Sequence, residues 1–511
     1  ILKNFKHIPN DFQRGLLIVN LSSFFCIRGQ QDKALQMLQD FPVGQGNNQH
    51  PAEQILFLQG QALTLWYTGN IEKAHKFLEA MKALATKHQT WVLAGCHVYT
   101  HQIYCGLPRQ DLPAARAALK GLEPLIARLP GVANVHFQFM AGWVAMAENN
   151  YSNASTHLKK GLKTVLTMGT PFPEAEVRLA LAEVLLEFHQ QKEAAGHITK
   201  GLDIAHLMAS PYLEFKGLCL EARLALHQGQ QSVSLEKLKR AIGVGKRYNI
   251  VITSFWRPSV MADLCAKALT HNIEIDYVQD LIRQRRLIPE HPPLTIPHWP
   301  WAVKISTLGR LAIEIDGILL EWSRKAQRRP LQLLKCLIAL GGREIPETQL
   351  TEKLWPDADG DFAHQNFATT LHRLRKLLKY EEAILLKDKL VSLNPRYCWI
   401  DIWAWDALVS IIQTSGSSVE NPSDLNQALA IYQGPFLPDE PDEPWAMWLR
   451  KRMQSQYLRL LETHIEMLRS PEHKPAVCQI LEHACQIEPA TRPIFEHYSQ
   501  GLFKPQSKEE V

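Results

Sequence analysis

The chain has 511 residues, of which 46% are hydrophobic, so it is long enough for about three to four domains with substantial cores. Its net charge of +5 is too small to identify a nucleic-acid-binding protein from composition, so a basic DNA-binding surface would have to be local. The nine cysteines include no Cys-x-x-Cys pair, and the sequence has no signal peptide and no apolar run of about 18 residues. These features exclude a membrane-spanning protein and predict a cytoplasmic protein with reduced thiols.

The first half of the chain repeats a pair of helices. A turn with Gly or a substitute separates an apolar helix from an amphipathic one, and a small residue early in the second helix allows close packing. These small residues are Ala34, Ala74, Ala115, Ala154, Ala194 and Ser234. Their spacing of 40, 41, 39, 40 and 40 residues predicts a tetratricopeptide-like superhelix over residues 1–287, with a looser turn near Gly106 and a degenerate last copy from His271.

The concave face of such a superhelix is the expected place for a ligand or a partner protein. Its candidate side chains are aromatic or polar residues of the first helix of each pair. They are Trp66, Trp91, His101 and Trp143, followed by Tyr67, His97, Tyr99 and Trp256. The alternative is that each of them takes part in ordinary core packing, which is the more common role of such residues.

Residues 288–302, IPEHPPLTIPHWPWA, are rich in proline, which fixes φ and removes backbone donors. We expect an extended linker here. After it the apolar period changes from 3.6 to 2, and VKIST, LAIEI and ILLEW are predicted to form short strands of an antiparallel sheet.

Three helices and a hairpin are predicted to follow these strands. The helices cover residues 330–340, 347–354 and 361–379, and Asp359 and Asp361 are the candidate caps of the third. AILLKDKLVSL predicts a hairpin with a basic tip, and CWIDI a strand that closes the sheet. This order is that of a winged helix, in which the third helix reads the major groove and the hairpin lies beside the DNA backbone.

The third of these helices has an apolar face and an opposite face that lacks carboxylates. The apolar face consists of Phe367, Leu371, Leu374 and Leu378. No acidic residue occurs between Phe362 and Tyr380. Such a face suits DNA, because amides and arginine read base edges while hydroxyls and lysine contact phosphates. A solvated basic surface helix is the alternative that this stretch alone leaves open.

Two long stretches of the second half carry family motifs. EKLWPDADGDFAHQNFATTLHRLRKLL contains LW-P followed by N-x3-T-L-x-RLR-x-LL, and it resembles the OmpR-type winged helix of bacterial regulators of the SARP class. LNQALAIYQGPFLPDEPDEPWAMWLRKRM resembles the bacterial transcriptional activator domain that follows it there, with Y-x-G-x-x-L-P at Tyr432, Gly434, Leu437 and Pro438. The first half resembles the helical-repeat sensor of MalT-type, LuxR-related regulators.

This resemblance implies DNA contacts for individual residues. Asn366, Thr369 and Arg373 hold the base-reading positions of the recognition helix, with Gln365 as a weaker candidate. The implied backbone contacts are Thr370, His372, Arg375 and Lys376 on that helix, Lys387 and Lys389 at the wing tip, and Arg328 and Arg329 at the first helix. Three aspartates just before the helix reduce its basic excess, which predicts a weak monomeric site that dimers on repeated half-sites strengthen.

The predicted fold class is therefore mainly α: a tetratricopeptide-like α-superhelix, an α+β winged-helix domain and a C-terminal helical lobe. The expected boundaries are a sensor at 1–287, a linker at 288–302, a winged helix at 303–402, an activator domain at 403–504 and a disordered tail at 505–511. The resemblance implies an ATPase module before the sensor in many relatives. Because this chain starts at Ile1 in helical sequence, we expect either a part of a longer protein or a branch without that module.

The expected function is sequence-specific transcriptional regulation, more often activation, in the bacterial cytoplasm. The expected partners are double-stranded promoter DNA, RNA polymerase, a small-molecule or protein inducer in the repeats, and a second copy of the chain on DNA. No cofactor, metal or enzymatic activity is expected, since GVGKR at 243–247 lacks the Ser or Thr of a phosphate-binding loop and no hydrolase motif occurs. The alternative is a repeat scaffold whose winged helix makes protein contacts instead.

Overall fold

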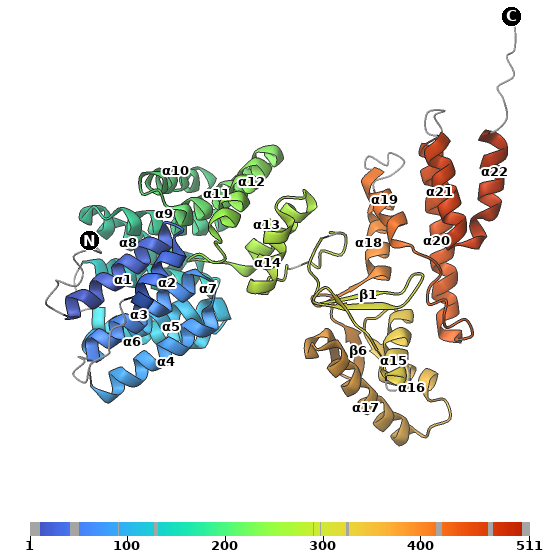
Figure 1. Ribbon diagram of the computed structural model, residues 1–511, viewed down its shortest axis with the longest axis horizontal. Helices are drawn as coiled ribbons and strands as arrows, with labels where there is room; N and C mark the ends of the chain where they lie inside the picture. The colour runs from blue at the N-terminus through green and yellow to red at the C-terminus, as the bar shows by residue number, and fades with distance from the viewer. Residues whose placement is uncertain are drawn as a thin grey trace, which may run out of the picture. The chain divides into compact units, whose positions relative to one another are not determined.

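The computed structural model describes residues 11–40, 51–89, 91–126, 131–289, 291–296, 298–322, 327–414, 422–468 and 474–502. The chain forms two compact units, unit 1 (Ile1–Glu290) and unit 2 (His291–Val511). Both are drawn in Figure 1, unit 1 from blue to green and unit 2 from yellow to red. The mainly helical fold predicted from the sequence is confirmed. None of the helices in these ranges combines the length and the apolar character needed to cross a membrane.

Unit 1 consists of helices that pack in consecutive pairs. They are α1 (Asp11–Ile27), α2 (Gln31–Asp40), α3 (Pro51–Tyr67), α4 (Ile71–Lys87), α5 (Trp91–Gly106), α6 (Leu112–Ile126), α7 (Val132–Ala147), α8 (Tyr151–Met168), α9 (Pro171–Glu187), α10 (Gln191–Leu207), α11 (Pro211–His227), α12 (Gln231–Tyr248), α13 (Pro258–Thr270) and α14 (Ile275–Arg285). Each pair contacts the next, as the repeats of a superhelix do.

The turn chemistry predicted for the repeats is observed. All six small residues at the repeat positions are 0% exposed, because another helix packs directly on each of them. The turns at Gly29, Gly69, Asn149, His189 and Gly229 have positive φ, which ends the first helix of the pair. The looser copy differs: Gly106 keeps a right-handed φ of −69°, a 3-10 turn follows over Leu107–Arg109, and Gln110 takes the left-handed position at φ 61°.

The superhelix turns far enough for its first pair to contact its fifth and sixth. Ser210 Oγ, just before α11, donates a hydrogen bond of 2.7 Å to the carbonyl of Ile27 at the end of α1. Arg28 Nη1 donates to the carbonyl of Met208 at 3.2 Å. These bonds join residues about 180 positions apart, so they link the first repeat to the fifth and sixth.

Unit 2 begins with the predicted order of strands, three helices and a hairpin. One sheet has the order β3-β2-β1-β7, with β1 (Val303–Ser306) antiparallel to β2 (Ala312–Ile315) and parallel to β7 (Cys398–Ile400), and with β3 (Ile318–Leu319) at its edge. The helices are α15 (Arg328–Ala339), α16 (Glu347–Leu354) and α17 (Gly360–Leu378). The hairpin of β5 (Ile384–Lys387) and β6 (Leu390–Leu393) pairs with β4 (Ile345–Pro346) in the order β4-β6-β5.

The C-terminal helices share their core with this sheet. They are α18 (Asp401–Thr414), α19 (Pro422–Ile431), α20 (Pro444–Met467), α21 (Lys474–Ile487) and α22 (Arg492–Leu502). A single cluster of buried side chains runs from Val303 on β1 to Ala484 on α21. The segments expected to be separate domains, 303–402 and 403–504, thus share one hydrophobic core. The expected tail at 505–511 lies outside the described residues.

The proline-rich segment is not a free linker over its whole length. Residues 291–302 belong to unit 2, where the side chains of Trp299 and Trp301 are buried. Trp399 Nε1 donates to the carbonyl of Leu294 at 2.9 Å, and Gln427 Nε2 donates to the carbonyl of Thr295 at 2.5 Å. The expectation of an extended linker over 288–302 is therefore wrong for this part, because the indole rings bury apolar area and two carbonyls find donors.

Candidate functional site

Helix α17 carries the candidate DNA-contacting side chains and has well-defined ends. Asp359 is its cap and accepts a hydrogen bond of 2.8 Å from the backbone N–H of Phe362, which decides between the two candidate aspartates. The helix ends at Lys379, which has a left-handed φ of 60°. Its apolar face, predicted from the sequence, is buried against α15. The opposite face is therefore fixed toward solvent.

We call the exposed side of this helix the α17 polar face. It consists of Gln365, Asn366, Thr369, His372, Arg373 and Lys376. All are exposed except Asn366, which is half-buried at the edge. Their spacing of three and four residues places them in one stripe along about three turns of helix. Amide, hydroxyl and basic groups are thus presented together, with no carboxylate of this helix among them.

Two residues assigned to the phosphate-contacting set lie elsewhere. Thr370 is only 7% exposed, because it lies on the same side as Phe367 and packs in the core, so its predicted phosphate contact is wrong. Arg375 is half-buried, and its Nε and Nη2 donate to the carbonyl of Ile384 at 3.3 and 3.0 Å. The Arg375 guanidinium therefore holds the start of β5 against α17.

The hairpin β5–β6 presents the predicted basic tip. Lys387, Asp388 and Lys389 are all exposed. Asp388 and Lys389 have φ of 51° and 63°, and the paired residues Lys387 and Leu390 flank them. Two left-handed residues between paired strands form the two-residue turn that matches strand twist, so the lysines lie at the end of a regular hairpin.

Glu347, which sequence reasoning missed, connects the hairpin to α17. It is the first residue of α16 and is buried, and its carboxylate pairs with Nδ1 of His364 on α17. Its backbone N–H donates to the carbonyl of Lys389 at 2.9 Å. His364 is thereby a positioning residue. The only hint in the sequence was an acid directly after the Ile345-Pro346 break.

The two arginines at the start of α15 differ in their contacts. Both side chains are exposed. Arg329 lies with its guanidinium 6.0 Å from the ring centre of Trp355, and its Nη1 donates to the carbonyl of Leu354 at 3.3 Å. Arg329 thus holds the C-terminal end of α16, which makes it a poorer candidate for a phosphate contact than Arg328.

Asp401 joins the sheet to the C-terminal helices. This buried carboxylate begins α18 and accepts hydrogen bonds from the N–H and Oγ1 of Thr307, from the N–H of Leu308 at 2.7 Å and from the N–H of Ile402 at 2.9 Å. Burial raises the pKa of Asp401, and the hydrogen bonds oppose that rise. Four donors satisfy the carboxylate, as a buried charge requires.

The Y-x-G-x-x-L-P motif also connects the two parts of unit 2. Gly434 has φ of +140°, and a Cβ there would lie 3.0 Å from the Cα of Gly309, so only glycine allows this approach. Leu437 N–H donates to the carbonyl of Thr307 at 3.0 Å. Tyr432 is buried, and its hydroxyl donates to Glu488 at 2.7 Å. The motif is thus explained by packing and hydrogen bonding within unit 2.

In unit 1 the proposed ligand-binding aromatics pack against one another. Trp66, His101 and Trp143 are buried, and Trp66 Nε1 donates to the carbonyl of Tyr104 at 2.8 Å. The ring of Tyr104 lies 4.9 Å from that of Trp66 and 5.5 Å from that of Trp143. Burial lowers the pKa of His101 to about 3. These contacts favour the alternative of core packing for these three side chains.

The remaining candidates of this set also lie mostly inside unit 1. Tyr67 and Trp256 are buried, while His97 and Tyr99 are half-buried. The side chain of Trp91 lies outside the described residues. The sequence thus selected interior aromatic residues, but it did not separate core packing from ligand contact.

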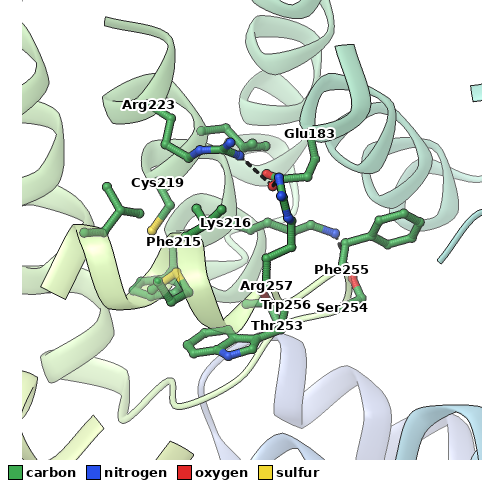
Figure 2. A pocket seen from close by; sticks show the side chains of 14 residues that line it. Glu183, Phe215, Lys216, Cys219, Arg223, Thr253, Ser254, Phe255, Trp256 and Arg257 are labelled. Atoms are coloured by element: carbon green, nitrogen blue, oxygen red, sulfur yellow. Dashed lines mark hydrogen bonds and ion pairs between the residues drawn. The ribbon is translucent and has the colours of Figure 1, made fainter. Parts of the chain in front are cut away.

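A row of buried ion pairs on α9 and α11 was missed. Lys216 Nζ lies 3.2 Å from Glu176, and Arg223 Nη1 lies 2.5 Å from Glu183. Each pair joins residues 40 positions apart, which is the length of one repeat. An alignment of the repeats would therefore have placed each basic side chain at the same repeat position as its acidic partner. Figure 2 shows Glu183, Lys216 and Arg223 together with Arg257, which approaches Glu183 to 3.5 Å.

The pocket in Figure 2 has a volume of about 40 Å³ and is lined by Lys216, Arg223, Ser254, Phe255 and Arg257, among others. This space suffices for a few water molecules but is far below the several hundred Å³ of a typical ligand site. In the part of the chain that the structure describes, no three His, Cys, Asp or Glu side chains come together in a way that would hold a metal ion.

Comparison with solved structures gives matches of low sequence identity. A Rap protein complexed with competence and sporulation factor has a TM-score of 0.41 at 9% identity and covers 88% of this chain and 99% of its own. The apo form of RapI has a TM-score of 0.36 at 11% identity, covering 86% and 98%, and a human IFIT1 dimer has 0.28 at 9%, covering 86% and 90%. These scores are too low to carry a functional comparison.

Comparison with curated proteins gives no match to this sequence. The family described as "Bacterial transcriptional activator domain" matches residues 401–504, close to the limits expected from the sequence. The match begins at Asp401, the residue that ties α18 to β1, and covers α18 to α22. The C-terminal helical part of unit 2 is thus similar to the activator domain of bacterial transcriptional regulators.

Proposed function

We propose that this chain is a bacterial transcriptional regulator of the SARP-like type, in which unit 2 binds double-stranded promoter DNA and unit 1 receives a signal. The observation that carries the proposal is the α17 polar face beside a hairpin with a lysine tip. Both belong to the same compact unit as the segment that matches the activator domain. On this proposal residues 303–402 act as an OmpR-type winged helix.

The proposal assigns α17 to the major groove and the hairpin β5–β6 to the adjacent backbone. Asn366, Thr369 and Arg373 would read base edges, with Gln365 at the same end of the helix. The phosphate contacts would come from His372, Lys376, Lys387, Lys389 and Arg328, all of which are exposed. Arg375, Arg329 and Glu347 would position these elements without touching DNA.

The second candidate function is a scaffold that uses the same surface for protein contacts. Exposed apolar side chains favour it: Phe362 is 58% exposed at the start of α17, and Leu385 and Leu386 on β5 are 45% and 43% exposed. A protein contact, however, has no need of lysines at the hairpin tip together with an acid-free helix face. We therefore prefer DNA as the partner.

The proposal includes no catalytic step or cofactor. Its further partners are RNA polymerase, through the activator-like helices, and a second copy of the chain on repeated half-sites. It places the protein in the bacterial cytoplasm. A signal in unit 1 would act by binding one arrangement of the chain more tightly than another, since only differential affinity shifts such an equilibrium.

The test replaces two cations of the α17 polar face, Arg373→Ala with Lys376→Ala, and measures binding to the DNA upstream of the chain's own gene by gel shift. Loss of a base-reading arginine costs about 1–3 kcal/mol of discrimination. Loss of a phosphate lysine lowers the slope of log affinity against log salt by about one. We expect at least a ten-fold loss of affinity.

The matched control is Lys239→Ala with Arg240→Ala, two exposed cations on α12 of unit 1. This variant loses the same charge and should bind DNA as the wild type does. If both double variants lose affinity by the same factor, the effect is one of overall charge. If the α17 variant keeps wild-type affinity, the scaffold function is favoured.

A further inference from the structure

The segment Ile250–Arg257, which connects α12 to α13, runs through the interior of unit 1. We call it the inner segment. It contains no helix or strand, yet residues 250–256 are each at most 8% exposed. Irregular segments usually lie on the surface, because their backbone polar groups need water. Because the inner segment is buried, side chains of unit 1 must supply hydrogen-bond partners in place of water.

Its apolar side chains contact repeats that are far apart in the sequence. Val251 packs on the α3–α4 turn, where a Cβ on Gly69 would lie 2.4 Å from its Cγ2. The ring of Phe255 stacks on that of Trp143 at 5.7 Å and lies 5.0 Å from that of Phe139, both on α7. The segment therefore touches the first helices of several repeats, the helices expected to form the concave face.

Its polar groups complete the row of ion pairs on α9 and α11. Ser254 Oγ hydrogen-bonds to the Glu176 carboxylate and accepts from Lys216 Nζ at 2.7 Å. The N–H of Ser254 donates to the hydroxyl of Tyr212 at 2.8 Å. This serine is thus held by a carboxylate, an ammonium group and a phenol, all supplied by other helices.

The end of the segment is held in the same way. Arg257 pairs with Glu187 and lies 3.5 Å from Glu183, as Figure 2 shows for the latter residue. Glu183 and Glu187 also pair with Arg223, at 2.5 and 2.9 Å. The two carboxylates therefore pair with two guanidinium groups, one on α11 and one in the inner segment.

The backbone of the segment is strained at its centre. Phe255 has φ of 56°, a conformation that a bulky residue rarely adopts and that persists only where the surroundings enforce it. The enforcing contacts are those of its ring on α7 and of Ser254 beside it. A hydroxyl, an aromatic ring and a guanidinium each occupy a complementary site, which is how a peptide ligand is recognised.

We infer that the inner face of the superhelix is a peptide-binding channel and that the inner segment is its resident occupant. The ligand in trans would be a short peptide with a hydroxyl residue, two aromatic residues and an arginine in succession. The inference rests on the proposed role of unit 1 as the signal-receiving part. Binding of such a peptide would displace the inner segment from the channel.

Displacement of the inner segment would change the contacts of the last helix of unit 1. The inner segment continues into α13, and the ring of Trp256 lies 6.0 Å from the guanidinium of Arg285 at the end of α14. The Nε of Arg285 has no hydrogen-bond partner among the described residues. Loss of the inner segment from the channel would therefore remove this contact with the last helix of the unit.

The first test uses a fluorescent peptide with the sequence of residues 250–257 and the full chain carrying Phe255→Ala with Arg257→Ala. Weakening the resident occupant should raise the affinity for the peptide at least ten-fold over that of the wild type, measured by fluorescence anisotropy. A peptide with alanine in place of its phenylalanine and arginine is the matched control and should not bind. Equal binding of both peptides, or none by a variant with wild-type circular dichroism, would overturn the inference.

A second test does not depend on the folding of that variant. In Gly69→Cys with Val251→Cys the two Cβ atoms would lie 3.5 Å apart, within the range of about 3.5–4.5 Å for a disulfide. Excess unlabelled peptide should speed hydrogen exchange in residues 250–257 of the reduced chain and not of the oxidised one. Each single cysteine variant is a control for the strain at Gly69. No change in the reduced chain contradicts the inference, whatever the DNA-binding assay shows.

Discussion

Thr370 and Arg375 show how far a single residue can be assigned from helix periodicity. At 100° per residue each lies about 60–80° from the centre of the apolar face, at the border between core and solvent. Thr370 lies on the buried side of that border, with only 7% of its surface exposed. Arg375 is held because the carbonyl of Ile384 lies within reach. Border positions are decided by what packs beside the helix, which its own sequence does not contain.

His101 gives a prediction at the residue scale. Histidine has a pKa of about 6.5 in an unfolded chain, whereas burial lowers the pKa of His101 to about 3 in the folded one. Below pH 6.5 the unfolded chain therefore binds more protons. The free energy of unfolding should fall as pH decreases from 6.5 toward 3, by up to about 1.4 kcal/mol per unit from this residue.

The measurement is urea denaturation at pH 7 and at pH 5, for the wild type and for His101→Phe, which keeps a ring and removes the titration. The variant should lose less stability between these two pH values than the wild type. His271→Phe, at an exposed position after α13, is the control and should behave as the wild type does. An identical loss in all three chains would show that His101 does not titrate as proposed.

At the element scale, the helix pairs and the hairpin were predictable because their signals are local. The buried small residues and the left-handed turn residues of unit 1 depend on neighbours within one repeat. The hairpin tip needs only its two turn residues and the alternation of its strands. In the looser copy a 3-10 turn at Leu107–Arg109 is added after the first helix. The residue with left-handed φ is therefore Gln110 and not the glycine that ends the first helix.

The hairpin carries the prediction at this scale. Replacing Lys387 and Lys389 with alanine should weaken binding to all DNA sequences about equally, because a lysine on a phosphate carries no sequence information. The slope of log affinity against log salt should fall by about two. Arg373→Ala is the contrast, since it should change the preference at one base pair. If the variant without Lys387 and Lys389 has an altered base preference, the hairpin tip reads bases. If its salt slope is unchanged, the two lysines do not contact phosphates.

At the scale of the whole molecule, one hydrophobic core extends through unit 2. The family match begins at Asp401, but that carboxylate is bound by Thr307 and Leu308 at the end of β1. The buried cluster crosses the expected boundary at residue 402 without interruption. A domain boundary needs a stretch that few contacts cross, and this position has many.

This gives a prediction for fragments of the chain. Residues 291–511 alone should unfold cooperatively, whereas residues 291–402 should show no cooperative transition, because they leave the inner side of the sheet without Phe436, Leu437 and the helices behind them. Circular dichroism during heating measures both. Residues 1–290 serve as the control for an intact unit. Cooperative unfolding of residues 291–402 would show that the winged-helix part is a domain by itself.

The sequence by itself determined the repeat period, the turn positions, the order of strands and helices in unit 2 and the composition of the α17 polar face. These depend on periodicity and turn chemistry, which act over a few residues to one repeat. Only the tertiary structure decided that Thr370 is buried and that Glu347 links α17 to the hairpin. It also decided that residues 291–302 of the expected linker share one unit with the two expected domains, and that residues 250–257 lie inside unit 1. Each of these depends on side chains that meet from distant parts of the chain, and a single sequence does not state which distant residues meet.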